Sequence, residues 1–255
     1  EERIPGGANL MLKEKLFGDE KPELMIAQHV YPDLEVGYLG FKPGIYMASS
    51  DEIYITVKGK GGHAALPDTL IDPVLITAHI ITALQQIVSR NNKPGLPSVL
   101  SIGKVQADGA VNVIPDEVKL EGTFRTMDES WRERAHNNIK RTISNIAESF
   151  GGKADIEIRN GYPVLTNDPY VTKIVRKFSE DWVGKENVVD LDIRMTAEDF
   201  AYFSQKYPSV LYRLGVTDPG TKGAPLHSSR FNVNEKSIQL AMENFSWIAV
   251  NLLKG

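Results

Sequence analysis

The chain contains no cysteine among its 255 residues. This absence excludes disulfides, thiolate metal ligands and a cysteine nucleophile from this stretch of sequence. It suits a reducing compartment, and we therefore expect a cytoplasmic protein, although a secreted protein can also lack cysteine.

Excess positive charge and long apolar runs are also missing. The net charge is −4 and the isoelectric point is near 5.8, so the sequence offers no basic footprint for nucleic acid. No apolar run is long enough to span a membrane, and no signal-peptide pattern opens the chain. The composition, 42 % hydrophobic and 24 % charged residues, is that of a soluble globular protein with one large domain or two ordinary ones.

The two ends of the chain have the patterns of an α/β domain. Residues 6–17 show helical periodicity, with Gly18 as a stop, and Glu23–Pro32 is a continuous apolar strand that ends at a His and a Pro. A helix followed by such a strand indicates a parallel α/β sheet. Similar elements are predicted near the other end: helices over Pro169–Val183, Ala197–Phe203 and Glu235–Leu253, and a strand over Ser209–Val216.

The middle of the chain has a different pattern. Asp51–Gly59 alternates apolar and polar residues, as a half-buried antiparallel strand does. The elements that follow are a helix over Asp72–Arg90, strands over Ser98–Val105 and Glu117–Thr126, a helix over Glu129–Phe150, and a strand over Ala154–Asn160. This β-α-β-β-α-β order is that of a ferredoxin-like unit. We therefore predict an α/β domain (residues 1–49 and 164–255) interrupted by an inserted ferredoxin-like domain (residues 50–163).

Five histidines are candidates for chemistry. His79 and His136 lie inside predicted helices without neighbouring ligand types, which favours structural roles for both. The other three, His29, His63 and His227, lie at loop positions, where functional residues concentrate.

Two of these loop histidines follow strands of the predicted α/β domain. His29 comes at the carboxyl end of its strand, the edge at which open α/β sheets bind ligands, although it could equally cap the strand. His227 lies in the loop "GAPLHSSRF" after another strand. Imidazole and carboxylate groups are the usual ligands of hydrolytic metal sites. With the opening pair Glu1 and Glu2 near the same sheet edge, these histidines could form half of a metal site.

A second group of polar residues belongs to the inserted domain. His63 lies in "GKGGHAALP", where glycines let the backbone approach a ligand closely. Asn112 can donate to a carbonyl oxygen, and Arg125 can pair bidentately with a carboxylate. Ordinary surface roles are the alternative for Asn112 and Arg125.

Taken in order, several motifs resemble the M20 family of metallopeptidases and amidohydrolases. They are "EE…GGA", "QHVYPDLEVG", "GKGGHAALPDTLIDP", "IVSRN", "GAVNVIPDEVKLEGTFRTMD", "TAEDFAYF" and "LHSSRF". The similarity is greatest to the subgroup that removes acyl groups from amino acids, of the aminoacylase and hippurate hydrolase type. It extends over essentially all 255 residues.

The resemblance implies roles for the α/β part. Glu1 matches the general base, and Glu2, His29 and His227 match metal ligands. The cofactor implied is a pair of divalent metal ions, with zinc expected first and manganese or cobalt as alternatives, because nitrogen and oxygen ligands select weakly among them.

The resemblance also implies roles for the inserted domain. His63 matches a lid histidine that reaches into the active site of the partner subunit in a homodimer, and Asn112 and Arg125 match residues that hold the substrate. Glu198 and Asp199 of the "EDF" motif match positions close to the site without a definite role.

One departure from the family pattern is large. The family has an upstream section with the first strands of the catalytic domain and further metal ligands, and this sequence does not contain it. The resemblance therefore predicts an incomplete metal site. The predicted function is metal-dependent hydrolysis of N-acyl amino acids or related small amides. The alternatives are a dipeptidase or aminopeptidase of the same family, and a non-catalytic dimerising fragment.

Overall fold

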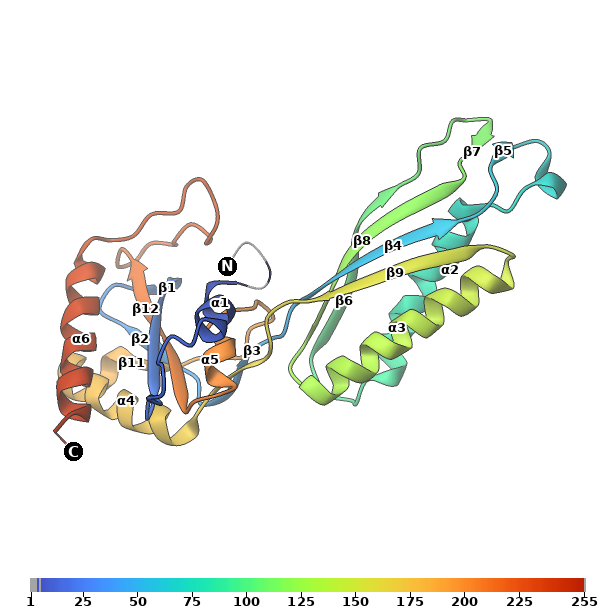
Figure 1. Ribbon diagram of the computed structural model, residues 1–255. Coiled ribbons are helices and arrows are strands. Elements are labelled where there is room, and N and C mark those ends of the chain that lie inside the picture. The colour runs from blue at the N-terminus through green and yellow to red at the C-terminus, as the bar shows by residue number, and fades with distance from the viewer. Residues whose placement is uncertain (1–3, 5, 255) are drawn as a thin grey trace. The chain divides into compact units, whose positions relative to one another are not determined.

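The computed structural model describes Ile4 and residues 6–254 and divides them into two compact units. The α/β unit consists of Gly6–Met47, Leu165–Arg194 and residues 198–254. The inserted unit consists mainly of Ala48–Val164 and also includes Met195–Ala197. Figure 1 shows the elements of each unit.

The α/β unit is built on a four-stranded sheet in the order β1-β12-β2-β11. The strands are β1 (Met25–Glu35), β12 (Ser209–Thr217), β2 (Leu39–Phe41) and β11 (Val188–Asp190). The pairs β1–β12 and β11–β2 are parallel, whereas β12–β2 is antiparallel. The sheet is therefore mixed rather than purely parallel, because the chain reverses within three residues after β1, where Gly37 adopts a left-handed φ of 103°.

Alternate residues of β12 face two different hydrophobic clusters. Val210, Tyr212 and Leu214 pack with helices α4 (Pro169–Val183) and α6 (Lys236–Leu252). Leu211 packs on the opposite face with the other elements of the unit. These are the helices α1 (Gly7–Lys13) and α5 (Ala201–Ser204) and the strand pair β3 (Gly44–Met47) and β10 (Leu165–Asn167). The sheet is thus covered on both faces (Figure 1).

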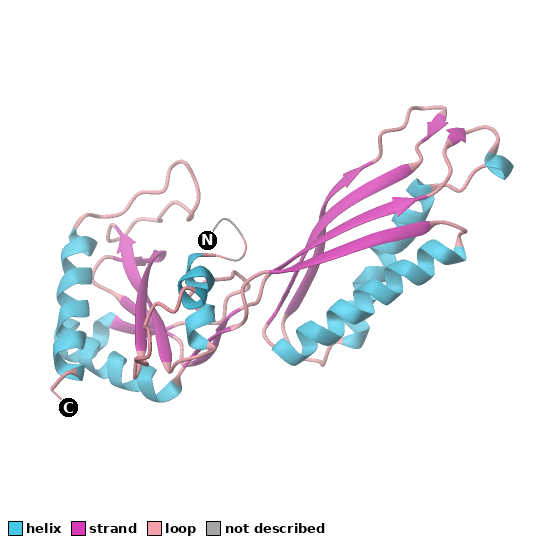
Figure 2. Ribbon diagram, viewed as in Figure 1, coloured by secondary structure: helices cyan, strands magenta, loops and turns pink. Residues whose placement is uncertain are grey.

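The inserted unit is an antiparallel sheet with two long helices, shown in Figure 2. Its sheet order is β6-β8-β4-β9. In chain order the elements are β4 (Asp51–Lys58), α2 (Pro73–Gln86), β6 (Ser98–Gln106), β8 (Glu117–Thr126), α3 (Glu129–Ser149) and β9 (Lys153–Asn160). This arrangement confirms the predicted ferredoxin-like order.

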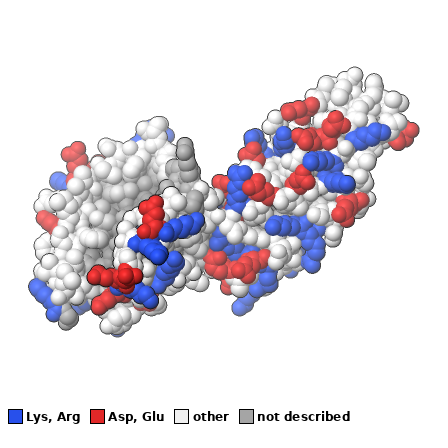
Figure 3. All heavy atoms as spheres, viewed as in Figure 1, with Lys and Arg blue, Asp and Glu red and all other residues white. Residues whose placement is uncertain are grey.

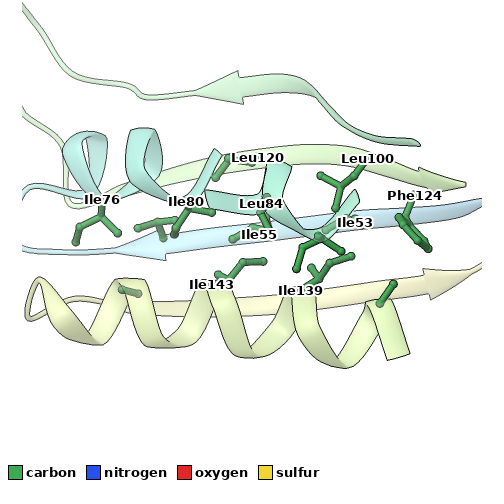
Figure 4. Close-up of a cluster of buried hydrophobic side chains, with 14 of the residues drawn as sticks. Ile53, Ile55, Ile76, Ile80, Leu84, Leu100, Leu120, Phe124, Ile139 and Ile143 are labelled. Carbon is green, nitrogen blue, oxygen red and sulfur yellow. The ribbon is translucent and has the colours of Figure 1, made fainter. Parts of the chain in front are cut away.

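Local sequence signals explain why these elements form. On β4 the side chains of Ile53, Ile55 and Val57 are buried and alternate with more exposed residues. Asp72 caps α2 by accepting hydrogen bonds from the first-turn amides, and Asp128 caps α3 in the same way. Figure 4 shows the resulting core, in which side chains of α2 and α3 meet those of the sheet.

Several boundaries differ from the prediction. The first helix ends at Lys13 instead of continuing to residue 17, and α5 covers only Ala201–Ser204. The α-helical part of α2 ends at Gln86 and continues as a π-turn over Ile87–Asn91. Short elements that the periodicity did not indicate include β2, β3, β10 and β11 of the α/β unit, the strands β5 (Gly62–His63) and β7 (Val113–Ile114), and 3-10 turns at Pro67–Thr69 and Lys185–Asn187. Elements of two or three residues are too short to produce a periodic pattern.

Charged residues of both signs are interspersed over the visible face of the inserted unit (Figure 3). This face has no extended patch of positive or negative charge alone, in agreement with the modest net charge of the chain. Within residues 6–254, none of the helices has the length and apolar character needed to cross a bilayer.

Leu84→Ala is expected to lower the free energy of unfolding of the inserted unit by about 2–5 kcal/mol, because Leu84 is fully buried and its loss leaves a cavity. Leu75→Ala is the matched control: it lies on the same helix with a half-exposed side chain, and we expect a change within about 0.5 kcal/mol. Urea denaturation measures both. Equal effects of the two substitutions would contradict the placement of this core.

Candidate active site

His29 lies within the longest strand of the α/β unit. The sequence places it at the end of a strand, but β1 continues to Glu35, because its parallel pairing with β12 extends past His29 and, after a bulge, to Thr217. In this register His29 is the partner of Arg213. The prediction that His29 lies at the carboxyl end of its strand is therefore wrong.

The imidazole of His29 has a defined orientation. Its Nδ1 is 2.8 Å from the carbonyl oxygen of Val30, which can only accept a hydrogen bond. In the neutral ring the proton therefore sits on Nδ1, and Nε2 keeps its lone pair. Nε2 lies 3.9 Å from the Oε2 of Glu198. A backbone carbonyl that fixes one ring nitrogen while the other is available is the usual arrangement of a metal-binding histidine.

The electrostatic surroundings favour a neutral His29. Burial lowers the pKa of His29 below its ordinary value, and the positive charge of Arg213 lowers this pKa further. His227 and Arg194 act on the same pKa in the same direction. Neutral imidazole is the form that binds metal.

Glu198 and Asp199 connect this region to the start of the first helix. Glu198 is buried, with an exposed fraction of 8 %, and faces His29. Asp199 accepts a hydrogen bond at 2.9 Å from the backbone amide of Ala8, in the first turn of α1. The sequence left both residues without a definite role, and the structure makes Glu198 a candidate ligand. The sequence signal for Glu198 is its place in the motif "TAEDFAYF", and the structural signal is the burial of its carboxylate.

His227 belongs to the loop between β12 and α6. Its φ of 61° is in the left-handed region, which residues other than glycine seldom adopt. Such a backbone conformation tends to occur at functional sites. The loop of His227 follows β12, the strand that pairs with the strand of His29.

The side chains of this region are of the types that bind divalent metal ions in hydrolytic enzymes. Two imidazoles, His29 and His227, and the carboxylate of Glu198 are ligands of the kind that zinc accepts. Within Ile4 and residues 6–254, however, no group of three or more potential ligand side chains is placed to hold a metal ion. The predicted base Glu1 and the predicted ligand Glu2 lie outside the described residues.

His63 and Asn112 lie together in the inserted unit. His63 is on β5, which pairs with β7 so that His63 faces Val113, the residue after Asn112. The carbonyl oxygen of Asn112 accepts a hydrogen bond from the amide of Ala64 at 3.0 Å. The Nδ1 of His63 accepts a hydrogen bond from the amide of Ala65 at 3.1 Å. In the neutral ring of this exposed histidine, Nε2 therefore carries the proton and is a donor.

Arg125 lies apart from this pair. It is the ninth of ten residues of β8, and its Nη1 donates to the carbonyl oxygen of Met195 at 3.3 Å. His63 lies beyond the opposite end of β8, where Gly61 donates its amide to Asp116. The length of the strand separates the two regions by roughly 25 Å. Within one chain, the inserted unit therefore does not bring His63 and Arg125 to one point.

A family model, Peptidase family M20/M25/M40, matches residues 1–249 of the chain. The chain belongs to this family. The match includes the sheet and both candidate histidines of the α/β unit, as well as the whole inserted unit.

The M20 chain is similar to curated bacterial enzymes. It is 38 % identical over 237 residues to an N-acetyldiaminopimelate deacetylase of Exiguobacterium sibiricum, covering 93 % of this chain and 62 % of that protein. It is 35 % identical over 243 residues to the enzyme of the same name from Shouchella clausii, covering 95 % and 64 %. The chain thus spans less than two thirds of the length of these relatives.

A solved structure supports the same assignment. The YXEP protein of Bacillus subtilis, a dinuclear metal binding peptidase from the M20 family, matches with a TM-score of 0.79 and 28 % identity. The match covers 98 % of this chain and 62 % of that one. The α/β fold with a separate antiparallel sheet is therefore the fold of M20 peptidases.

Proposed function

We propose that this chain forms part of a metal-dependent amidohydrolase that removes the acyl group from an N-acyl amino acid. The observation that carries the proposal is the orientation of His29, whose Nε2 faces the buried carboxylate of Glu198 while Nδ1 is fixed by a backbone carbonyl. The curated relatives act, by name, on an acetylated diamino acid. An acetylated amino acid is accordingly the first substrate class to test.

Four residues are proposed as ligands of two divalent metal ions: Glu2, His29, Glu198 and His227. Zinc is expected first, and manganese and cobalt suit the same ligands. When bound, such ions supply Lewis-acid chemistry and lower the pKa of water to about 7. The hydrogen bond from His29 to the carbonyl of Val30 keeps its imidazole turned for this role.

The proton transfers are assigned to Glu1. As general base it accepts a proton from the attacking water and then passes it to the departing amine. A carboxylate suits both steps, because it is ionised at neutral pH and can return the proton once it has taken it up. This role comes from the motif match of Glu1, which lies outside the described residues.

The polar residues of the inserted unit are proposed to act on the substrate. The Nε2–H of His63 donates to the carbonyl oxygen as negative charge develops on it, an interaction of about 3–4 kcal/mol when the donor is preorganised. Asn112 adds a donor beside it, and Arg125 binds the free carboxylate. His63 lies beyond one end of β8, and Arg125 lies near its other end. One substrate molecule would therefore contact Arg125 of one subunit and His63 of the other subunit in a homodimer.

The test is a hydrolysis assay on a polypeptide of the relatives' full length that contains this chain. With zinc or manganese added, we expect turnover of N-acetyldiaminopimelate, N-acetylmethionine or hippurate and no turnover after treatment with a chelator. A dipeptide with a free amino terminus serves as the comparison substrate. Hydrolysis of the dipeptide alone would contradict the proposal and favour a dipeptidase.

His63→Ala is expected to lower kcat by about 10²–10³-fold, because it removes a donor to the developing oxyanion. The metal content should remain that of the unaltered protein, since His63 is not a proposed ligand. His79→Ala is the matched control, an exposed histidine on α2 of the same unit. Steady-state kinetics and elemental analysis measure these effects. Loss of metal in His63→Ala would show that the role assigned to this residue is wrong.

A further inference from the structure

Two segments of the inserted unit lead to its boundaries with the rest of the chain. The first connection consists of residues 48–51, immediately before and at the start of β4, and the second connection of residues 161–164, after β9. The amide of Ser50 donates to the carbonyl oxygen of Tyr162 at 2.9 Å, which ties the two connections to each other.

Asp51 is a buried charged residue at the end of the first connection. Its side chain is completely inaccessible to solvent. It accepts two hydrogen bonds from Arg132, from Nε at 2.9 Å and from Nη2 at 2.5 Å. The Nε2 of His136 lies 2.8 Å from its Oδ2, and the amide of Gly161, in the second connection, donates to its Oδ1 at 3.3 Å.

Arg132 and His136, two partners of Asp51, lie with Glu129 on one face of helix α3. Glu129, Arg132 and His136 are three and four residues apart, a spacing that aligns side chains along a helix. Glu129 accepts a hydrogen bond from the amide of Val164 at 2.6 Å. Arg132 donates to the carbonyl oxygen of Gly161 at 3.3 Å and also pairs with Glu129. The same helix face thus holds the first connection through Asp51 and the second connection directly.

The charge of Asp51 is stabilised by these contacts. Burial alone would raise the pKa of Asp51, but the hydrogen bonds from His136 and Arg132 outweigh it and hold this pKa below its ordinary value. A bidentate arginine–carboxylate pair also fixes geometry, because both groups are planar. His136, for which the sequence gave no partner, therefore takes part in a buried polar network.

We infer that Glu129, Arg132, His136 and Asp51 form a mount that fixes the direction in which both connections leave the inserted unit. The first connection begins and the second connection ends at a boundary between the two compact units, and the chain crosses between the units again before Met195 and after Ala197. The mount ties the two connections to each other and prevents them from flexing separately.

A third segment is held by the inserted unit in a similar way. The carbonyl oxygen of Thr196 accepts a hydrogen bond from the amide of Ala48 at 3.1 Å, and that of Met195 accepts one from Arg125. Residues 195–197 group with the inserted unit for this reason. They directly precede Glu198, the candidate ligand of the α/β unit.

The test compares two substitutions of Glu129. Glu129→Ala removes the acceptor for Val164, whereas Glu129→Gln keeps a side-chain oxygen at that place and is the matched control. The side chain of Glu129 is 40 % exposed, so both proteins are expected to fold. Spin labels are attached at Lys140→Cys and Lys173→Cys, exposed positions on α3 and α4 of a chain without other cysteines.

Pulsed electron resonance then gives the distribution of the distance between the labels. We expect the distribution in Glu129→Ala to be at least twice as wide as in Glu129→Gln, and the amide of Val164 to exchange with solvent faster. Equal widths in the two variants would overturn the inference, and so would unchanged exchange at Val164 in Glu129→Ala. Neither measurement depends on turnover. A result that contradicts this inference can therefore be distinguished from one that contradicts the proposed function.

Discussion

His29→Ala is expected to abolish metal binding and hydrolysis together in a polypeptide of the relatives' full length that contains this chain. His29 offers Nε2 toward Glu198, and its pKa is lowered, so the neutral imidazole is ready to bind a metal ion. Loss of a residue that merely orients a ligand weakens metal affinity by 10–100-fold. Loss of the ligand itself should therefore weaken it by more than about 100-fold.

The measurement for His29→Ala is metal content by elemental analysis after dialysis, together with kcat/KM on an N-acetyl amino acid. His79→Ala, which removes an exposed histidine of the inserted unit, is the control and should retain both metal and activity. Full metal content and activity in His29→Ala would mean that the candidate site is not the metal site.

Glu1→Gln is expected to stop hydrolysis and to leave the metal content unchanged in the same full-length polypeptide. Glutamine has the size of glutamate but cannot accept the proton of the attacking water. Loss of a general base costs about 10²–10⁴-fold in kcat. This substitution therefore separates proton transfer from metal binding.

The companion substitution Glu2→Gln gives the opposite pattern. It replaces a proposed ligand, so both metal content and activity should fall. Elemental analysis of the two variants side by side decides the assignment. If Glu1→Gln loses the metal and Glu2→Gln keeps it, the roles of the two glutamates are reversed.

The fold of the inserted unit could be predicted because its signals are local. The alternation of Ile53, Ile55 and Val57 with polar residues specifies a strand with one buried face, and two aspartates mark the starts of the long helices. Each signal lies within a few residues of the element that it specifies. The order of these elements then restricts the sheet to few topologies.

The α/β unit was less predictable from the sequence. Strands β2 and β11 have three residues each, too few for a periodic pattern. Their partners are distant in the sequence, since β2 pairs with β12 and with β11. The antiparallel pairing of β2 therefore emerged only from the folded sheet.

The candidate site shows the same division between local and distant information. Residue types and short motifs were sufficient to predict the family pattern, the order of the main elements, and His29 and His227 as candidate ligands. The contacts of Glu198 with His29 and of His136 with Asp51 could be found only in the folded chain. Those pairs are 169 and 85 residues apart, and side chains so distant along the chain meet only where strand pairing and core packing bring their elements together.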